Sequence, residues 1–206
     1  MNTRLTTLAV SALLLSSANA FAASSVDLTV KGLIVPSACT PSLSGGGMID
    51  HGKVSAKDLN PDRGTAIGVH TLSMTVDCDA PIQFALHPID NRAASGLTTD
   101  FGLGFINETQ KLGHFSLTWR GMVADGVTVQ PIASMDQGKT WYSEKFWEPS
   151  MYMAAASMSD DTQPLPIQNL SVDLEVLTII NAAASLDLSN EVTIDGSATV
   201  EVKYLL

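Results

Sequence analysis

The sequence predicts an all-β protein, folded as an antiparallel β-sandwich with one disulfide. Apolar and polar residues alternate in nearly every apolar run, helical spacing is rare, and turn sequences separate the runs. We expect roughly seven to ten strands. A closed barrel stays an alternative, because alternation alone does not distinguish one closed sheet from two stacked sheets.

The expected strands share a period-two pattern that gives each of them one apolar face. They cover residues 26–30, 72–78, 82–86, 101–105, 115–119, 172–176 and 200–204. Turn sequences occupy residues 45–47, 61–64, 125–126, 137–138 and 195–196. The two Asp-Gly pairs, at 125–126 and 195–196, are the strongest hairpin predictions, and the second would form a closing hairpin over residues 191–199.

Composition and charge restrict the function classes. The 206-residue chain is 45% hydrophobic and 16% charged, which is typical of one globular domain and excludes a disordered chain. It carries 11 Lys and Arg against 21 Asp and Glu, a formal net charge of −10. Because phosphate backbones and anionic lipids attract basic surfaces, we expect no nucleic-acid partner and no binding to an anionic membrane surface.

Residues 1–22 have the three parts of a secretory signal peptide. Arg4 supplies a positive charge, residues 5–15 are apolar, and residues 16–22 are mostly small and contain two A-x-A cleavage sequences. The apolar part is about half the roughly 20 residues that a membrane helix needs, so we expect no membrane span after cleavage. Export to an oxidising compartment predicts a disulfide between Cys39 and Cys78, and two free buried thiols are the alternative.

The sequence contains none of the common catalytic motifs. There is no G-x-S-x-G sequence, no H-E-x-x-H sequence and no Gly-rich phosphate loop, and a disulfide would leave no cysteine as a nucleophile. The histidines show no metal-ligand spacing: His51, His70, His87 and His114. We therefore expect no enzymatic activity, no catalytic residue, no metal site and no cofactor.

An aromatic cluster in residues 141–152 offers a second functional interpretation. If Trp141, Tyr142 and Trp147 were exposed, their rings could stack on sugar rings. The protein would then be a soluble periplasmic or surface domain that binds carbohydrate or another small ligand. The structural alternative is that these bulky side chains fill the ends of the sandwich.

The two ends of the chain carry the most specific pattern. Residues 26–30 alternate, Gly32 precedes Cys39 by seven positions, and residues 71–77 lead into Cys78. The last expected strand covers residues 198–206, alternates between apolar and polar residues, and includes Tyr204. These features resemble the pilins of chaperone–usher fimbriae. Segments 191–199 and 204–206 also resemble the fimbrial-like secreted bacterial proteins grouped as domain-of-unknown-function family 1120, which is the closer match.

This resemblance implies an Ig-like, pilin-like β-sandwich over residues 33–206, preceded by an N-terminal extension over residues 23–32. A pilin-type sandwich lacks its last strand, and a donor strand fills the resulting groove. By resemblance, the donor residues of this chain are Val26, Leu28 and Val30, and Gly32 lies where the strand leaves the groove. The edge strand that meets the chaperone or the donor carries Val200, Val202 and Tyr204.

The implied partners are a periplasmic chaperone, an outer-membrane usher and neighbouring pilin-like subunits. The expected function is that of a minor or tip subunit of a fimbrium, assembled by donor-strand complementation and involved in cell adhesion. A self-complemented monomer is an alternative, in which residues 26–30 close the sandwich of their own chain. The expected location is the periplasm, or the cell surface where the subunit is part of a fimbrium.

Overall fold

A computed structural model describes Thr29 and residues 38–205. Within this part of the chain the regular structure consists of β-strands and three short 3-10 helices, Ser44–Gly47, Ala56–Asp58 and Ala183–Ser185. Residues 38–205 belong to one compact unit. The expected signal peptide (1–22) and most of the expected extension (23–32) lie outside the described residues.

The larger sheet contains the longest strands and is antiparallel throughout. Its order is β1 (Cys39–Leu43), β2 (Thr65–Ile82), β13 (Ile167–Ile180), β7 (Gly113–Ala124) and β11 (Phe146–Trp147). Two short strands also pair with β7, namely β4 (Phe101–Gly102) and β8 (Val127–Thr128). β1 is therefore the edge strand at one side of this sheet.

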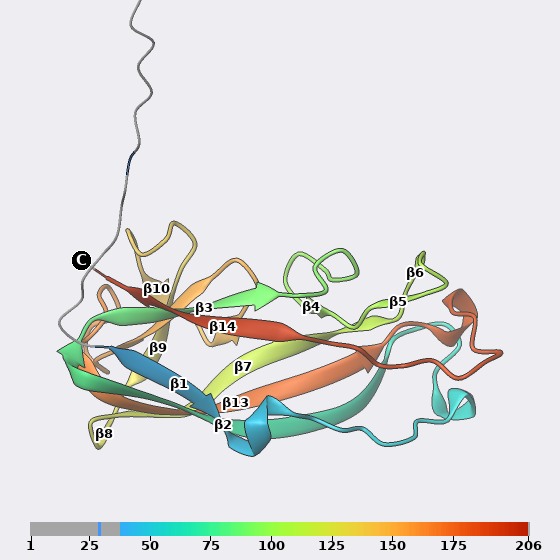
Figure 1. Cartoon of the computed structure of the whole chain (residues 1–206), viewed down its shortest axis with the longest axis horizontal. Helices are drawn as coiled ribbons and strands as arrows, with labels where there is room; N and C mark the ends of the chain where they lie inside the picture. Colours follow the sequence, from blue (N-terminus) through green and yellow to red (C-terminus); the bar gives the residue numbers. More distant parts are fainter. Residues whose placement is uncertain (1–28, 30–37, 206) are drawn as a thin grey trace, which may run out of the picture. The chain divides into compact units, whose positions relative to one another are not determined.

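The second sheet lies beside the first and ends in the C-terminal strand (Figure 1). Its order is β10 (Tyr142–Ser143), β9 (Gln130–Ser134), β12 (Tyr152–Ala156), β3 (Phe84–Asp90) and β14 (Ala198–Tyr204). A separate small hairpin joins β5 (Phe105–Ile106) to β6 (Gln110–Lys111).

The core lies between the two large sheets. Along β13 nearly every second residue is buried, which is the pattern of a strand with one dry face. Met74 and Val172 of the larger sheet belong to the same buried cluster as Leu86 and Met153 of the smaller sheet. The predicted all-β, antiparallel sandwich is therefore confirmed, and the two separate sheets rule against the barrel alternative.

Two expected strands are interrupted. The segment 82–86 is divided at Gln83, where the chain passes from β2 of the larger sheet to β3 of the smaller one. The segment 101–105 is divided between β4 and β5 by Gly104, which has a φ of +89°. A left-handed residue cannot continue a strand, so the chain changes direction there.

Of the two Asp-Gly hairpin predictions, one is confirmed and one is wrong. Asp125 and Gly126 have φ values of 48° and 80° and connect β7 to β8, as a type I′ turn requires. Asp195 and Gly196 form no hairpin, and no strand is assigned to residues 191–197. Gly196 instead allows close packing, because a Cβ there would lie 2.8 Å from Leu103 Cδ2.

The predicted disulfide is confirmed. Cys39 and Cys78 are direct partners in the register of β1 and β2, with a Cα–Cα distance of 4.0 Å. Since each strand of the pair carries one cysteine, the disulfide fixes β1 against the larger sheet. No cysteine among the described residues is free.

We expect the double substitution Cys39→Ala and Cys78→Ala to lower the free energy of unfolding by about 2–4 kcal/mol, because it removes a cross-link that constrains the unfolded chain. Urea denaturation followed by tryptophan fluorescence measures this change. Thr40→Ala, at an exposed position of the same strand, is the control and should change the unfolding free energy by less than about 0.5 kcal/mol. Equal stability of the double variant and this control would contradict the prediction.

Candidate functional site

The edge strands β1 and β14 contact each other on one side of the domain (Figure 1). β1 ends the larger sheet and β14 ends the smaller one, and the two strands are not paired with each other. Two largely irregular segments, residues 48–59 and 186–197, adjoin these strands in sequence and line a common cavity. The candidate site is the groove between two walls. One wall is β1 with residues 48–59, and the other is β14 with residues 186–197.

The backbone of β14 has one unpaired edge. Asn91 donates to the carbonyl of Ser197 and Leu205 donates to the carbonyl of Gln83, both at 3.0 Å, so the odd-numbered residues of β14 are the ones bonded to β3. The N–H and C=O groups of the even-numbered residues therefore point away from β3. Within residues 38–205, β14 pairs with no other strand.

The edge of β1 offers fewer backbone donors. Asp79 donates to the carbonyl of Ala38 at 3.0 Å, so Cys39, Pro41 and Leu43 direct their backbone groups away from β2. Pro41 has no N–H, and the N–H of Cys39 is already bonded to the hydroxyl of Tyr204 at 2.9 Å. An added strand would therefore find its main backbone partners on β14.

Tyr204 closes one end of the groove. Its hydroxyl accepts the hydrogen bond from Cys39, and its ring packs against the core. Val200 and Val202 lie on the same face of β14 and are likewise only partly buried. These three residues, predicted from the sequence to face a chaperone or donor, thus lie on the unpaired edge strand.

The groove has an apolar floor. A cavity of about 260 Å³ lies next to Leu43 and Ile49 on one side and Val200 on the other. Its floor comes from the larger sheet and the loop beside it: Leu72, Leu103, Phe115, Leu117, Leu174 and Val176. A second cavity of about 530 Å³ shares Ile49, His51 and Ile194 with the first, so the two adjoin and form one groove.

A polar patch interrupts this apolar surface. Nε2 of His51 and Oγ1 of Thr178 share a hydrogen bond of 3.0 Å, and the His51 and His70 rings meet edge to face with centroids 4.9 Å apart. Gly68 leaves room for both rings, since a Cβ there would lie 2.8 Å from His70 Nε2. Burial lowers the pKa of His51, and the neighbouring His70 lowers it further, whereas Asp50 acts in the opposite direction.

The predicted donor residues are not part of the described structure. Val26, Leu28, Val30 and Gly32 all lie outside the described residues, and their role stays a prediction. The structure therefore describes the groove but not the segment that is predicted to donate a strand.

The tryptophans of the aromatic cluster in residues 141–152 are not exposed at the surface. Trp147 is 1% exposed and meets Trp119 edge to face in the core, so its assignment to a ligand surface is wrong. Trp141 is partly buried, and its Nε1 donates to the carbonyl of Gly138 at 3.1 Å. Tyr142 is exposed. Binding of carbohydrate to this region stays an untested prediction.

The sequence patterns did not predict the walls of the groove. The Asp-Gly pair at 195–196 predicts a hairpin that would include Val192 and Ile194, whereas these two residues line the larger cavity. Their alternation continues in phase with Val200, Val202 and Tyr204, and this shared even-numbered phase is the signal that marks one long apolar edge. The irregular segment that holds Ile49 and His51 has no such signal.

Within Thr29 and residues 38–205, no group of three or more His, Cys, Asp or Glu side chains is arranged to hold a metal ion. No helix in that part of the chain is long and apolar enough to cross a membrane.

The fold and this site define an antiparallel β-sandwich with two edge strands beside an apolar groove. A family model described as "Protein of unknown function (DUF1120)" matches residues 28–100. The chain is 26% identical to Protein GltF of Escherichia coli (strain K12), over 98% of each chain. It is also 26% identical to Uncharacterized protein YhcF of the same strain, over 91% of this chain and 93% of that protein. These descriptions name no ligand and no assembly.

The lowered pKa of His51 predicts a pH-dependent stability. The folded state disfavours the charged imidazole. The contribution of His51 to the free energy of unfolding is therefore fully present above its ordinary pKa of 6.5, and it is lost as the pH falls below that value. Urea denaturation at about pH 8 and about pH 5 should show a smaller loss of stability for His51→Asn than for the unaltered protein. An equal loss in both proteins would contradict the prediction.

Proposed function

We propose that this protein is a minor or tip subunit of a fimbrial type, whose groove is completed by a β-strand from a neighbouring pilin-like subunit. The observation that carries this proposal is the unpaired edge of β14, next to partly buried Val200 and Val202. An added strand would pair with the free N–H and C=O groups of β14 and cover the apolar floor.

Burial of the groove floor supplies the driving force. Each aliphatic side chain removed from water contributes roughly 1.5–3 kcal/mol. A donor with aliphatic residues at alternate positions would place several such side chains against Leu72, Leu174 and Val176. The backbone bonds add affinity without regard to sequence, and the pockets select the side chains.

The path of the chain into β1 favours a donor from another molecule. Ala38 continues β1 in register, since Asp79 donates to its carbonyl and accepts a hydrogen bond from its N–H at 3.1 Å. Tyr204 closes the groove at this end. A donor segment of the same chain would have to reverse direction next to Ala38 and pass that closed end, which makes the self-complemented monomer the weaker alternative.

In this proposal the segment with Val26, Leu28 and Val30 is donated to another subunit. Before assembly, a periplasmic chaperone would lend a strand to the same edge, and an outer-membrane usher would exchange it. The confirmed disulfide between Cys39 and Cys78 supports folding in an oxidising compartment such as the periplasm.

A proline scan of β14 tests the proposal. Ala198→Pro removes an N–H that points away from β3, so the domain should fold with nearly unchanged stability. It should bind a peptide of alternating Val and Thr, about 12 residues long, roughly fivefold more weakly, which corresponds to the loss of one hydrogen bond. Isothermal titration calorimetry measures the affinity.

Two variants serve as controls for this scan. Ala198→Val keeps the N–H and should bind the peptide normally, whereas Thr199→Pro removes a bond to β3 and should lower the unfolding free energy. The proposal would be overturned if the unaltered protein bound no such peptide, or if Ala198→Pro and Ala198→Val bound it equally well.

Deletion of residues 24–31 distinguishes a donated strand from an internal one. If the segment is donated to another molecule, the shortened protein should unfold cooperatively, still bind the peptide, and fail to complement a second subunit. If the segment fills its own groove, deletion should expose several aliphatic side chains and cost roughly 1.5–3 kcal/mol for each. Thermal unfolding followed by circular dichroism shows which result holds.

A further inference from the structure

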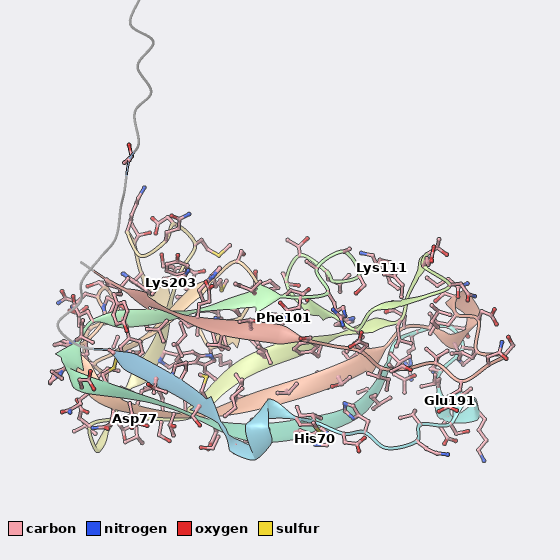
Figure 2. The ribbon with its side chains drawn as sticks, viewed as in Figure 1. His70, Asp77, Phe101, Lys111, Glu191 and Lys203 are labelled. Carbon is pink, nitrogen blue, oxygen red and sulfur yellow. A yellow bond between two sulfur atoms is a disulfide. The ribbon has the colours of Figure 1, made fainter. Side chains whose placement is uncertain are left out.

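The histidine patch lies at the groove, because His51 lines both cavities, Thr178 lines the smaller one, and the His70 ring meets the His51 ring. His70 is on β2 and Thr178 is on β13, opposite Gly68 in the register of the two strands, whereas His51 comes from the wall that follows β1. Figure 2 shows His70 on the larger sheet and Glu191 further toward the end of the domain that is remote from Lys203. Because His51 lines both cavities, a strand that runs along the groove must pass this patch.

The two imidazoles retain unused hydrogen-bonding capacity. Nε2 of His51 is bonded to Thr178, and Thr178 is 2% exposed. In the part of the chain that the structure describes, neither Nδ1 of His51 nor either ring nitrogen of His70 has a hydrogen-bond partner. A purely aliphatic donor would cover these nitrogens and leave them without water or a partner, which is unfavourable for buried polar groups.

The charged side chains nearby do not bond to the free ring nitrogens of the patch. The charged side chains that line the adjoining cavity are Asp50, Lys53 and Glu191. Asp50 favours the protonated form of His51, and both burial and the second imidazole disfavour it. A carboxylate placed beside the two rings would accept hydrogen bonds from both and neutralise the charge that burial disfavours. A hydroxyl group would provide only the hydrogen bond.

From this juxtaposition we infer that His51, His70 and Thr178 form a carboxylate subsite, and that the donor strand carries an Asp or Glu at one groove-facing position. This inference rests on the proposed function. The face of this chain formed by Val26, Leu28 and Val30 carries no carboxylate. The partner that fills the groove is therefore a different protein and not a second copy of this chain.

The test uses the full-length protein and a series of peptides. The parent is the alternating Val and Thr peptide of about 12 residues, and each derivative has Glu or Gln in place of one Val. Titration calorimetry at about pH 6 should show one position where the Glu peptide binds about tenfold more tightly than the Gln peptide. The preference for the Glu peptide over the Gln peptide should decrease at about pH 8. Binding of the Glu peptide should also be accompanied by uptake of a proton, and titrations in buffers of different ionisation heat detect this uptake.

Variants of the two histidines connect this preference to the subsite. His51→Gln and His70→Gln keep hydrogen-bonding capacity but cannot be protonated, so both should lose the preference for Glu and its pH dependence. Both should still bind the parent peptide, which separates the subsite from the groove as a whole. His51→Leu and His70→Leu provide a second pair, and these should bind the parent peptide at least as tightly as the unaltered protein does.

The results distinguish failure of the subsite from failure of the groove. If the parent peptide binds, but Glu is no better than Gln at every position, the carboxylate subsite is overturned and the proposed function stands. The same holds if the Glu preference persists in both Gln variants. If no peptide of the series binds the unaltered protein, the proposed function and the subsite are both overturned.

Discussion

The unpaired edge of β14 is the constraint on which the site depends. A strand whose alternate N–H and C=O groups point outward presents a template for another strand, and exposed edges of this kind promote aggregation unless they are covered. Here the edge adjoins an apolar floor, so backbone pairing and hydrophobic burial favour the same occupant. A strand with alternating aliphatic side chains meets both requirements together.

Local interactions hold the two sides of the groove in place without an occupant. The disulfide of Cys39 fixes β1 to the larger sheet, and the hydroxyl of Tyr204 joins β1 to β14. On the other side, the guanidinium of Arg92 bonds to the carboxylate of Asp195 through Nε at 3.0 Å. That ion pair is partly exposed and contributes little on its own, but the N–H of Asp195 also donates to the carbonyl of Leu103 at 3.3 Å and attaches this wall to the larger sheet's loop.

The sequence was sufficient to locate the long strands β2, β7 and β13 and the C-terminal strand β14, because local periodicity marks them. It was sufficient for the disulfide because export to an oxidising compartment predicts that bond. It was misleading at Asp195 and Gly196, since the same dipeptide makes a hairpin turn only where two paired strands flank it, as β7 and β8 flank Asp125 and Gly126. The prediction for Trp147 is wrong for a related reason: aromatic clustering along the chain does not reveal which rings enter the core. The groove depends on contacts between segments far apart in sequence, which alternation alone does not show.

Strand addition raises a question of specificity that the histidine patch addresses. Backbone pairing accepts nearly any extended segment, so an edge such as β14 distinguishes partners only through the side chains that enter the groove. Aliphatic pockets discriminate weakly among Val, Ile and Leu, because these differ by a methylene group or by branching. Two imidazoles next to buried Thr178 discriminate more strongly, since a partner that lacks the matching group leaves polar atoms covered and unbonded. A polar patch in an apolar groove therefore lowers the affinity for most strands and raises it for a matching one, which is how a groove built for strand addition can select its partner.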